Sequence, residues 1–94
     1  MESVDFSALP GGELVRRGLE DLARGKESEE ALLVLIGAPR LRGLGLSVPE
    51  DNSNLPEHRL YKLLACSNPD SAHSRYNALV RRLVRFERAI ECVA

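Results

Sequence analysis

The feature that most constrains this chain is a long amphipathic stretch in its last quarter. From Asp70 to Val93 there are 24 residues without a glycine or a proline. A helix that packs one side against another helix shows apolar residues at alternating spacings of three and four. We therefore predict a helix over residues 69–92. Its packing side, named the apolar seam below, packs either on the core of the same chain or on a second copy in a dimer. The seam consists of Tyr76, Leu79, Leu83, Phe86, Ile90 and Val93.

Two patterns in the first half of the chain predict helices of different kinds. Residues 12–25 carry one apolar stripe that includes Gly18, which predicts a helix that another helix approaches closely. Gly25 is a typical helix stop. Residues 28–38 begin with the capping residue Ser28 and are apolar on all sides, which favours a central, buried helix. A buried strand is the alternative for so short an apolar run.

The middle of the chain contains the strongest interruptions. Pro39 predicts a break in the preceding helix, followed by a short further helical turn. Residues 47–54 are rich in turn-forming residues and form the predicted main loop. A third main helix is expected over 56–65, capped by Asn54. The dipeptide at 68–69 is then expected to cap and open the long helix.

These patterns together predict an all-α protein, a compact bundle of four main helices with a long C-terminal amphipathic helix. A chain of 94 residues fits a single domain over 1–94, with residues 1–10 as an extended lead-in. The core of such a domain is small, and here it is mostly aliphatic. Because a second copy would add buried surface, we expect a homodimer.

Charge is distributed unevenly along the chain. Residues 1–57 hold six Lys and Arg against eleven Asp and Glu, whereas residues 58–94 hold seven against three. The net charges of the two parts are therefore −5 and +4, for a total of −1. The acidic and basic parts could attract each other within one chain, attract each other between two chains, or leave a basic surface free for a partner.

The long helix carries a row of arginines. A helix turns by about 100° per residue, which places Arg81, Arg85 and Arg88 opposite the apolar seam, with two further arginines flanking it. Such a row is either a solvated face or a surface that binds phosphates. Glu87 and Glu91 on the same helix would dilute its field. The candidates for a nucleic-acid or partner face are Arg75, Arg81, Arg82, Arg85 and Arg88.

The third and fourth helices also fit a helix-turn-helix pair. Their connector is short, and the start of the fourth helix is polar, as in a helix that reaches base edges. Asp70 at its tip argues against this interpretation because it would repel phosphate.

The sequence contains no catalytic or cofactor motif, so we expect no enzyme activity, no catalytic residue and no cofactor. A metal site drawn from His58, Cys66, His73 and Cys92 matches no standard zinc spacing, and no metal is expected. The two cysteines are expected to be free thiols. The segment 37–54 is either a kinked helix end with a loop or a partner surface with Arg40 and Arg42 as charged contacts.

The leading expectation is a non-enzymatic protein–protein interaction or regulatory module that self-associates. The alternative is a nucleic-acid-binding protein that uses the pair 56–65 and 69–92 and the arginines. The first residues lack a basic and apolar leader, which favours a cytoplasmic location. The longest apolar run, Ala31 to Pro39, has nine residues, which is too short to span a membrane.

Overall fold

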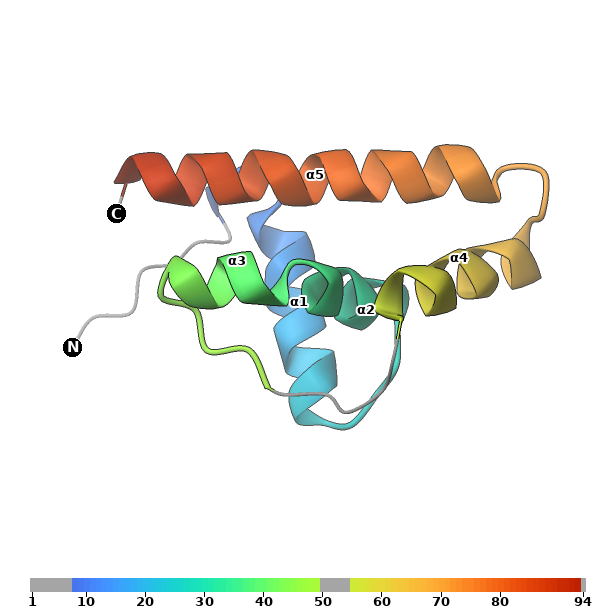
Figure 1. Cartoon of the computed structure of the whole chain (residues 1–94), viewed down its shortest axis with the longest axis horizontal. Helices are drawn as coiled ribbons and strands as arrows, with labels where there is room; N and C mark the ends of the chain where they lie inside the picture. The colour runs from blue at the N-terminus through green and yellow to red at the C-terminus, as the bar shows by residue number, and fades with distance from the viewer. Residues whose placement is uncertain (1–7, 50–54, 94) are drawn as a thin grey trace.

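The computed structural model describes residues 8–49 and 55–93, and these residues contain no strand. Their helices are α1 (Gly12–Ala23), α2 (Glu29–Ile36), α3 (Ala38–Gly43), α4 (Pro56–Ser67) and α5 (Ala72–Val93) (Figure 1). The prediction of an all-α fold is confirmed. The short α3 is separate from α2 because the break expected before Pro39 falls at Gly37, and the chain becomes helical again directly after it.

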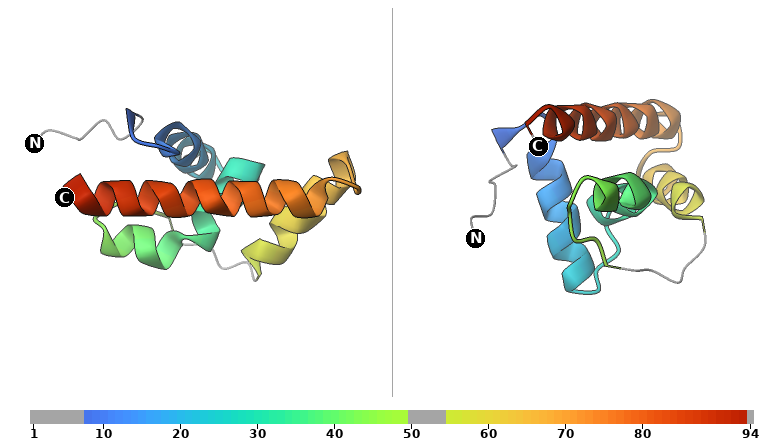
Figure 2. Two further views of the ribbon diagram at one scale, coloured as in Figure 1. Left: turned by 90° about the horizontal axis from the view of Figure 1, so that it is seen from above. Right: turned by 60° about the vertical axis from the view of Figure 1, so that its left-hand side comes forward.

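α2 lies at the centre of the fold and contacts each of the other four helices. In Figure 1, α3, α2 and α4 follow one another beneath α5, while α1 crosses behind them. The turned views of Figure 2 show α1 and α5 on different sides of α2. Residues 31–35 of α2 are all buried. The prediction of a central, buried helix is confirmed, and the alternative of a strand is excluded.

α1 approaches α2 closely because Gly18 has no side chain. A Cβ on Gly18 would overlap the carbonyl oxygen of Glu30 and the side chain of Val34. The apolar neighbours Leu14 and Val15 are buried on the same side of α1. Close packing against α2 thus compensates for the low helix propensity of glycine at this position.

The connection between α1 and α2 is fixed by local hydrogen bonds. Gly25 has a φ of 73°, and its amide donates back into the last turn of α1 while the Lys26 amide donates to the Asp21 carbonyl. This is the usual closure of a helix by a left-handed glycine. The Ser28 hydroxyl then accepts from the Ala31 amide at 3.1 Å and donates to the Asp21 carboxylate at 2.6 Å. The predicted roles of Gly25 and Ser28 are confirmed.

The starts of α4 and α5 differ from the prediction. The N-cap position of α4 is Leu55, with a φ of 57°, and not Asn54, which lies outside the described residues. α5 begins at Ala72, because the Asn68 side chain accepts from the Asp70 amide at 3.1 Å and holds a separate turn. The prediction that residues 68–69 cap and open this helix is therefore wrong.

The predicted irregular segments are described only in part. At the end of the lead-in, the Gly12 amide donates to the Leu9 carbonyl at 2.8 Å and turns the chain into α1. Residues 47–49 of the main loop have no regular structure. Residues 1–7 and 50–54, which complete the predicted lead-in and loop, lie outside the described residues.

Candidate anion-binding face

The apolar seam of α5 packs against the core of the same chain. Its first two members are half-buried against this core and its next three are buried, while the side chain of Val93 lies outside the described residues. The five described members are Tyr76, Leu79, Leu83, Phe86 and Ile90. The seam therefore faces inward, and its buried side chains are used within one chain.

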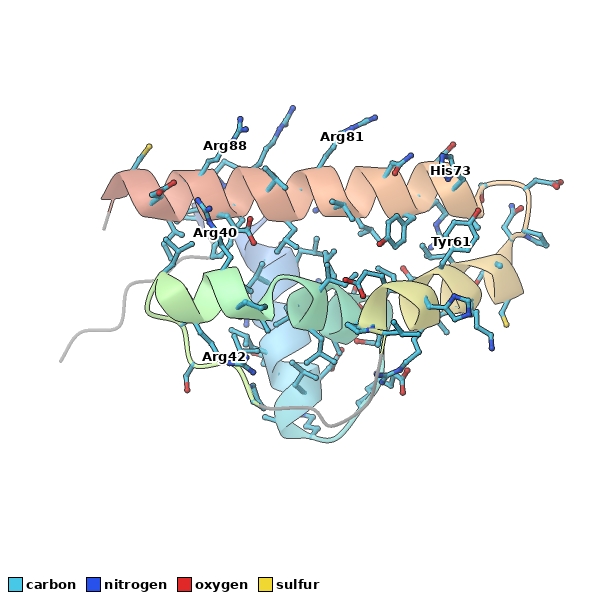
Figure 3. The ribbon with its side chains drawn as sticks, in the orientation of Figure 1. Arg40, Arg42, Tyr61, His73, Arg81 and Arg88 are labelled. Carbon is cyan, nitrogen blue, oxygen red and sulfur yellow. The ribbon has the colours of Figure 1, made fainter. Side chains whose placement is uncertain are left out.

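The exposed side of α5 presents four arginines, named the arginine face from here on: Arg81, Arg85 and Arg88 opposite the seam, and Arg82 beside them. Within residues 8–49 and 55–93, none of these side chains has an ion pair or a hydrogen bond. Figure 3 shows Arg81 and Arg88 pointing away from the rest of the molecule. The backbone of Arg82 packs on Gly11, because a Cβ on Gly11 would lie 2.6 Å from the Arg82 carbonyl oxygen. Arg82 therefore marks the edge of this face.

Arg75 does not belong to the arginine face, although the sequence pattern placed it among the same five candidates. Its Nη2 atom donates to both carboxylate oxygens of Glu29, at 3.2 and 3.1 Å, and joins the start of α5 to the start of α2. Arg59 of α4 pairs with Glu27 at 3.0 Å. Both ion pairs link the acidic part of the chain to its basic part, so the two parts attract each other within one chain.

The two carboxylates of α5 are directed toward Arg40 on α3. Arg40 pairs with Glu91 at 3.0 Å, and its charge also acts on Glu87. A Cβ on Gly37 would lie 3.0 Å from Glu87 Oε2, so this carboxylate faces the break between α2 and α3. Figure 3 shows Arg40 between α3 and α5. The glutamates therefore dilute the field of the arginine face less than their sequence positions imply.

Glu87 is the only charged side chain that is buried within the described residues. Burial raises the pKa of its carboxyl above the usual value for a glutamate, and the Arg40 guanidinium offsets part of this rise. A carboxylate that leaves water loses solvation, which a neighbouring positive charge restores in part. Glu87 therefore belongs to the contact between α3 and α5 and not to the exposed surface.

Three rings meet where α4 and α5 join, and they are named the ring cluster: Tyr61, His73 and Tyr76. The Tyr61 centroid lies 6.4 Å from that of His73 and 5.9 Å from that of Tyr76, with tilted ring planes. Such tilted pairs are favourable. The Asn77 amide nitrogen lies 3.2 Å from His73 Nε2. Burial, and secondly the charge of Glu57, raise the pKa of Tyr76.

The sequence interpretation did not group these three rings. Tyr61 precedes Asn68 by seven residues, and Tyr76 follows it by eight. Positions at similar distances from a short connector between two helices come close together where the helices pack on each other. These similar separations are the signal from which the contact of Tyr61 with Tyr76 could have been predicted.

In the structure, two of the polar residues on which the helix-turn-helix alternative depends have partners within the chain. The start of α5 carries polar residues, as expected, but Arg75 binds Glu29 and Asn77 contacts His73. A recognition helix needs such residues to reach base edges. The arginine face lies further along α5, on the exposed side of this helix.

The candidate metal ligands are not brought together. Cys66 and Cys92 are both exposed and free. The described part of the chain contains no group of three or more His, Cys, Asp or Glu that could hold a metal ion, so His58 and His73 complete no such group with the thiols. No described helix is long and apolar enough to cross a membrane.

Both arginines of the segment 37–54 are engaged within the chain. Arg40 pairs with Glu91, and Arg42 donates to the carbonyl oxygens of Val48 and Pro49 at 3.2 and 3.1 Å. These bonds hold the chain after α3 against the end of that helix. The described part of this segment therefore supports a kinked helix end with a loop more than a partner surface.

Comparisons of the chain with protein-family models, with curated proteins and with solved structures found no match. The function proposed below therefore depends on the geometry and charge of the described residues.

Proposed function

We propose that this protein is a binding module that recognises a polyanionic partner through the arginine face of α5. The observation that supports this proposal is the presence of four arginines on one exposed side of a 22-residue helix, without an ion pair in the described part of the chain. Guanidinium groups bind phosphate and carboxylate oxygens through parallel, charge-assisted hydrogen bonds. Several of them along one helix offer repeated contacts to a partner with repeated negative charges.

Within residues 8–49 and 55–93, ion pairs of acidic side chains with other arginines leave this face locally positive. Glu27, Glu29 and Glu91 each pair with an arginine that lies outside the face. The total charge of −1 is therefore compatible with a positive field over α5. An anion would meet guanidinium groups that are already exposed and need not break an internal ion pair to bind.

Heparin chromatography at low ionic strength tests the proposal. We expect the wild-type protein to be retained and to elute as salt is raised, because salt screens exposed charges. The face variant Arg81→Gln/Arg85→Gln/Arg88→Gln should lose most of this retention. Wild-type protein that passes through the column without delay at low salt would contradict the proposal.

A matched control separates the face from total charge. The α1 variant Arg16→Gln/Arg17→Gln/Arg24→Gln removes the same charge from exposed positions in α1 and at the residue that follows it. Unlike the arginine face, Arg16 and Arg17 form exposed ion pairs within α1. We expect this variant to be retained almost as strongly as the wild type. An equal loss of retention in both variants would show that total charge governs the binding, and the proposal for the arginine face would fail.

Self-association is a separate prediction. The small aliphatic core still favours it, but the apolar seam gives it no support, because the buried members of the seam pack within one chain. Multi-angle light scattering of the wild-type protein measures the mass directly. A monomer at high micromolar concentration would remove the homodimer from the proposed function and leave the anion-binding face unaffected.

A further inference from the structure

We infer that the polyanion is a single-stranded nucleic acid, whose phosphates follow the arginine face and whose bases stack on Tyr61 and His73. This inference rests on the proposed function and adds the chemical class of the partner. It is based on the position of the ring cluster, which lies at the start of α5, the helix that carries the arginines (Figure 3).

One ring of the cluster, His73, lies in line with the arginines along α5, while Tyr61 lies beside it on α4. His73, Asn77, Arg81 and Arg85 follow at intervals of four residues, and Arg88 extends the line. Steps of four residues drift by about 40° around a helix, so these positions share an inclined stripe. With a rise of about 1.5 Å per residue, the stripe is about 22 Å long.

The ring cluster is held in position by contacts within the chain. Tyr76 is half-buried and supports Tyr61 at a centroid distance of 5.9 Å, while Asn77 contacts His73 at 3.2 Å. Tyr61 nevertheless keeps 38% of its surface exposed, and His73 is exposed as well. Rings that are accessible and already ordered can stack on a base with little loss of conformational freedom.

The combination of rings and arginines favours a single strand over other polyanions. In a duplex the base faces are covered by their neighbours, and a protein reaches only the base edges in the grooves. An acidic peptide offers carboxylates to the arginines but no flat base to Tyr61 and His73. A single strand offers phosphates and base faces together, and proteins bind it without sequence preference through basic tracks and aromatic side chains.

Fluorescence anisotropy with a short labelled oligothymidine measures this binding, with a duplex of equal length and polyglutamate for comparison. We expect the wild type to prefer the single strand. The ring variant Tyr61→Leu/His73→Gln should bind it about tenfold more weakly, because stacking on these rings is lost. Its retention on heparin should stay unchanged, because heparin has no bases. The face variant should lower the slope of log K against log salt by about 2, for three lost phosphate contacts.

Tyrosine fluorescence gives a second measurement that does not require the ring variant to fold. The chain has two tyrosines and no tryptophan, so Tyr76→Phe leaves Tyr61 as its only strong emitter. Oligothymidine should quench this emission as a base stacks on Tyr61, and heparin should not. Unchanged emission on saturation with oligothymidine would overturn the inference.

The two proposals fail in different ways. A duplex or polyglutamate that binds as tightly as the single strand, or a ring variant with wild-type affinity, overturns the single-strand inference while heparin retention still supports the arginine face. A wild-type protein that binds neither heparin nor any oligonucleotide overturns both.

Discussion

The two helices α2 and α5 use their surfaces in opposite ways. α2 has eight residues, of which five consecutive ones are buried, and it contacts all four other helices. α5 has 22 residues, and its apolar seam packs on the core while its arginine face stays in solvent. A helix covered on all sides can serve only the fold. A helix with one face free of core contacts can change that face at little cost in stability, so different residues carry folding and binding.

The largest effect that can test this comparison lies within α5 itself. Phe86 is fully buried, whereas Val84, two positions earlier, keeps 37% of its surface exposed. Phe86→Ala should lower the free energy of unfolding by about 3–5 kcal/mol, because it removes a large side chain and leaves a cavity. Val84→Ala should change it by about 0.5 kcal/mol or less. Urea unfolding followed by circular dichroism measures both, and similar losses would mean that the two faces of α5 are not distinct.

The second effect concerns the close contact between α1 and α2. Gly18→Ala adds a methyl group that meets the backbone at Glu30, so we expect a loss of about 1–3 kcal/mol despite the better helix propensity of alanine. Gly43→Ala is the matched control, because a Cβ there meets nothing within 4 Å and the residue lies at the end of α3. It should be neutral or slightly stabilising. A stable Gly18→Ala variant would show that α2 is less tightly enclosed than the structure indicates.

Local patterns in the sequence were sufficient to predict much of the fold. The seam spacing, the cap at Ser28 and the stop at Gly25 each depend on residues a few positions apart, and the structure bears them out. The start of α5 could not be placed this way, because a side chain such as that of Asn68 can cap a helix or hold a turn with similar hydrogen bonds. The structure shows that Asn68 holds a turn, which residues a few positions apart do not determine.

The candidate site was less predictable because its electrostatics depend on distant residues. That Arg81, Arg85 and Arg88 share an exposed side follows from helix periodicity alone. The ion pair of Arg75 with a residue 46 positions away, and that of Arg40 with one 51 positions away, do not. Periodicity therefore predicts which side chains share a face, while tertiary packing decides which of them remain unpaired.

A smaller effect concerns Glu87, whose carboxylate lies between α3 and α5 and should make the stability depend on pH. Because burial raises the pKa of Glu87, the folded protein holds its proton more tightly than the unfolded chain does. This group therefore favours folding most below the unfolded-state pKa, and that contribution is lost as pH rises through the folded-state pKa. Glu87→Gln stays neutral, so its melting temperature should exceed that of the wild type by an amount that grows from acid to neutral pH.

Thermal unfolding at several pH values measures this difference. Glu91→Gln removes the same charge from an exposed ion pair with Arg40 and should change the melting temperature little. If Glu87→Gln melts below the wild type at neutral pH, the attraction between Glu87 and Arg40 outweighs the cost of burying the Glu87 carboxylate, and the prediction is wrong.

The smallest expected effect is the most informative about the division between folding and binding. The face variant Arg81→Gln/Arg85→Gln/Arg88→Gln should keep the stability of the wild type to within roughly half a kcal/mol, since these side chains are exposed and glutamine has a similar helix propensity. Loss of the like-charge pair Arg81 and Arg85, four residues apart, should even favour the helix slightly. Urea unfolding of this variant measures its stability, and heparin chromatography of the same variant measures its anion binding. A large loss of stability would mean that the arginine face supports the fold, and its loss of anion binding could then no longer be assigned to the face itself.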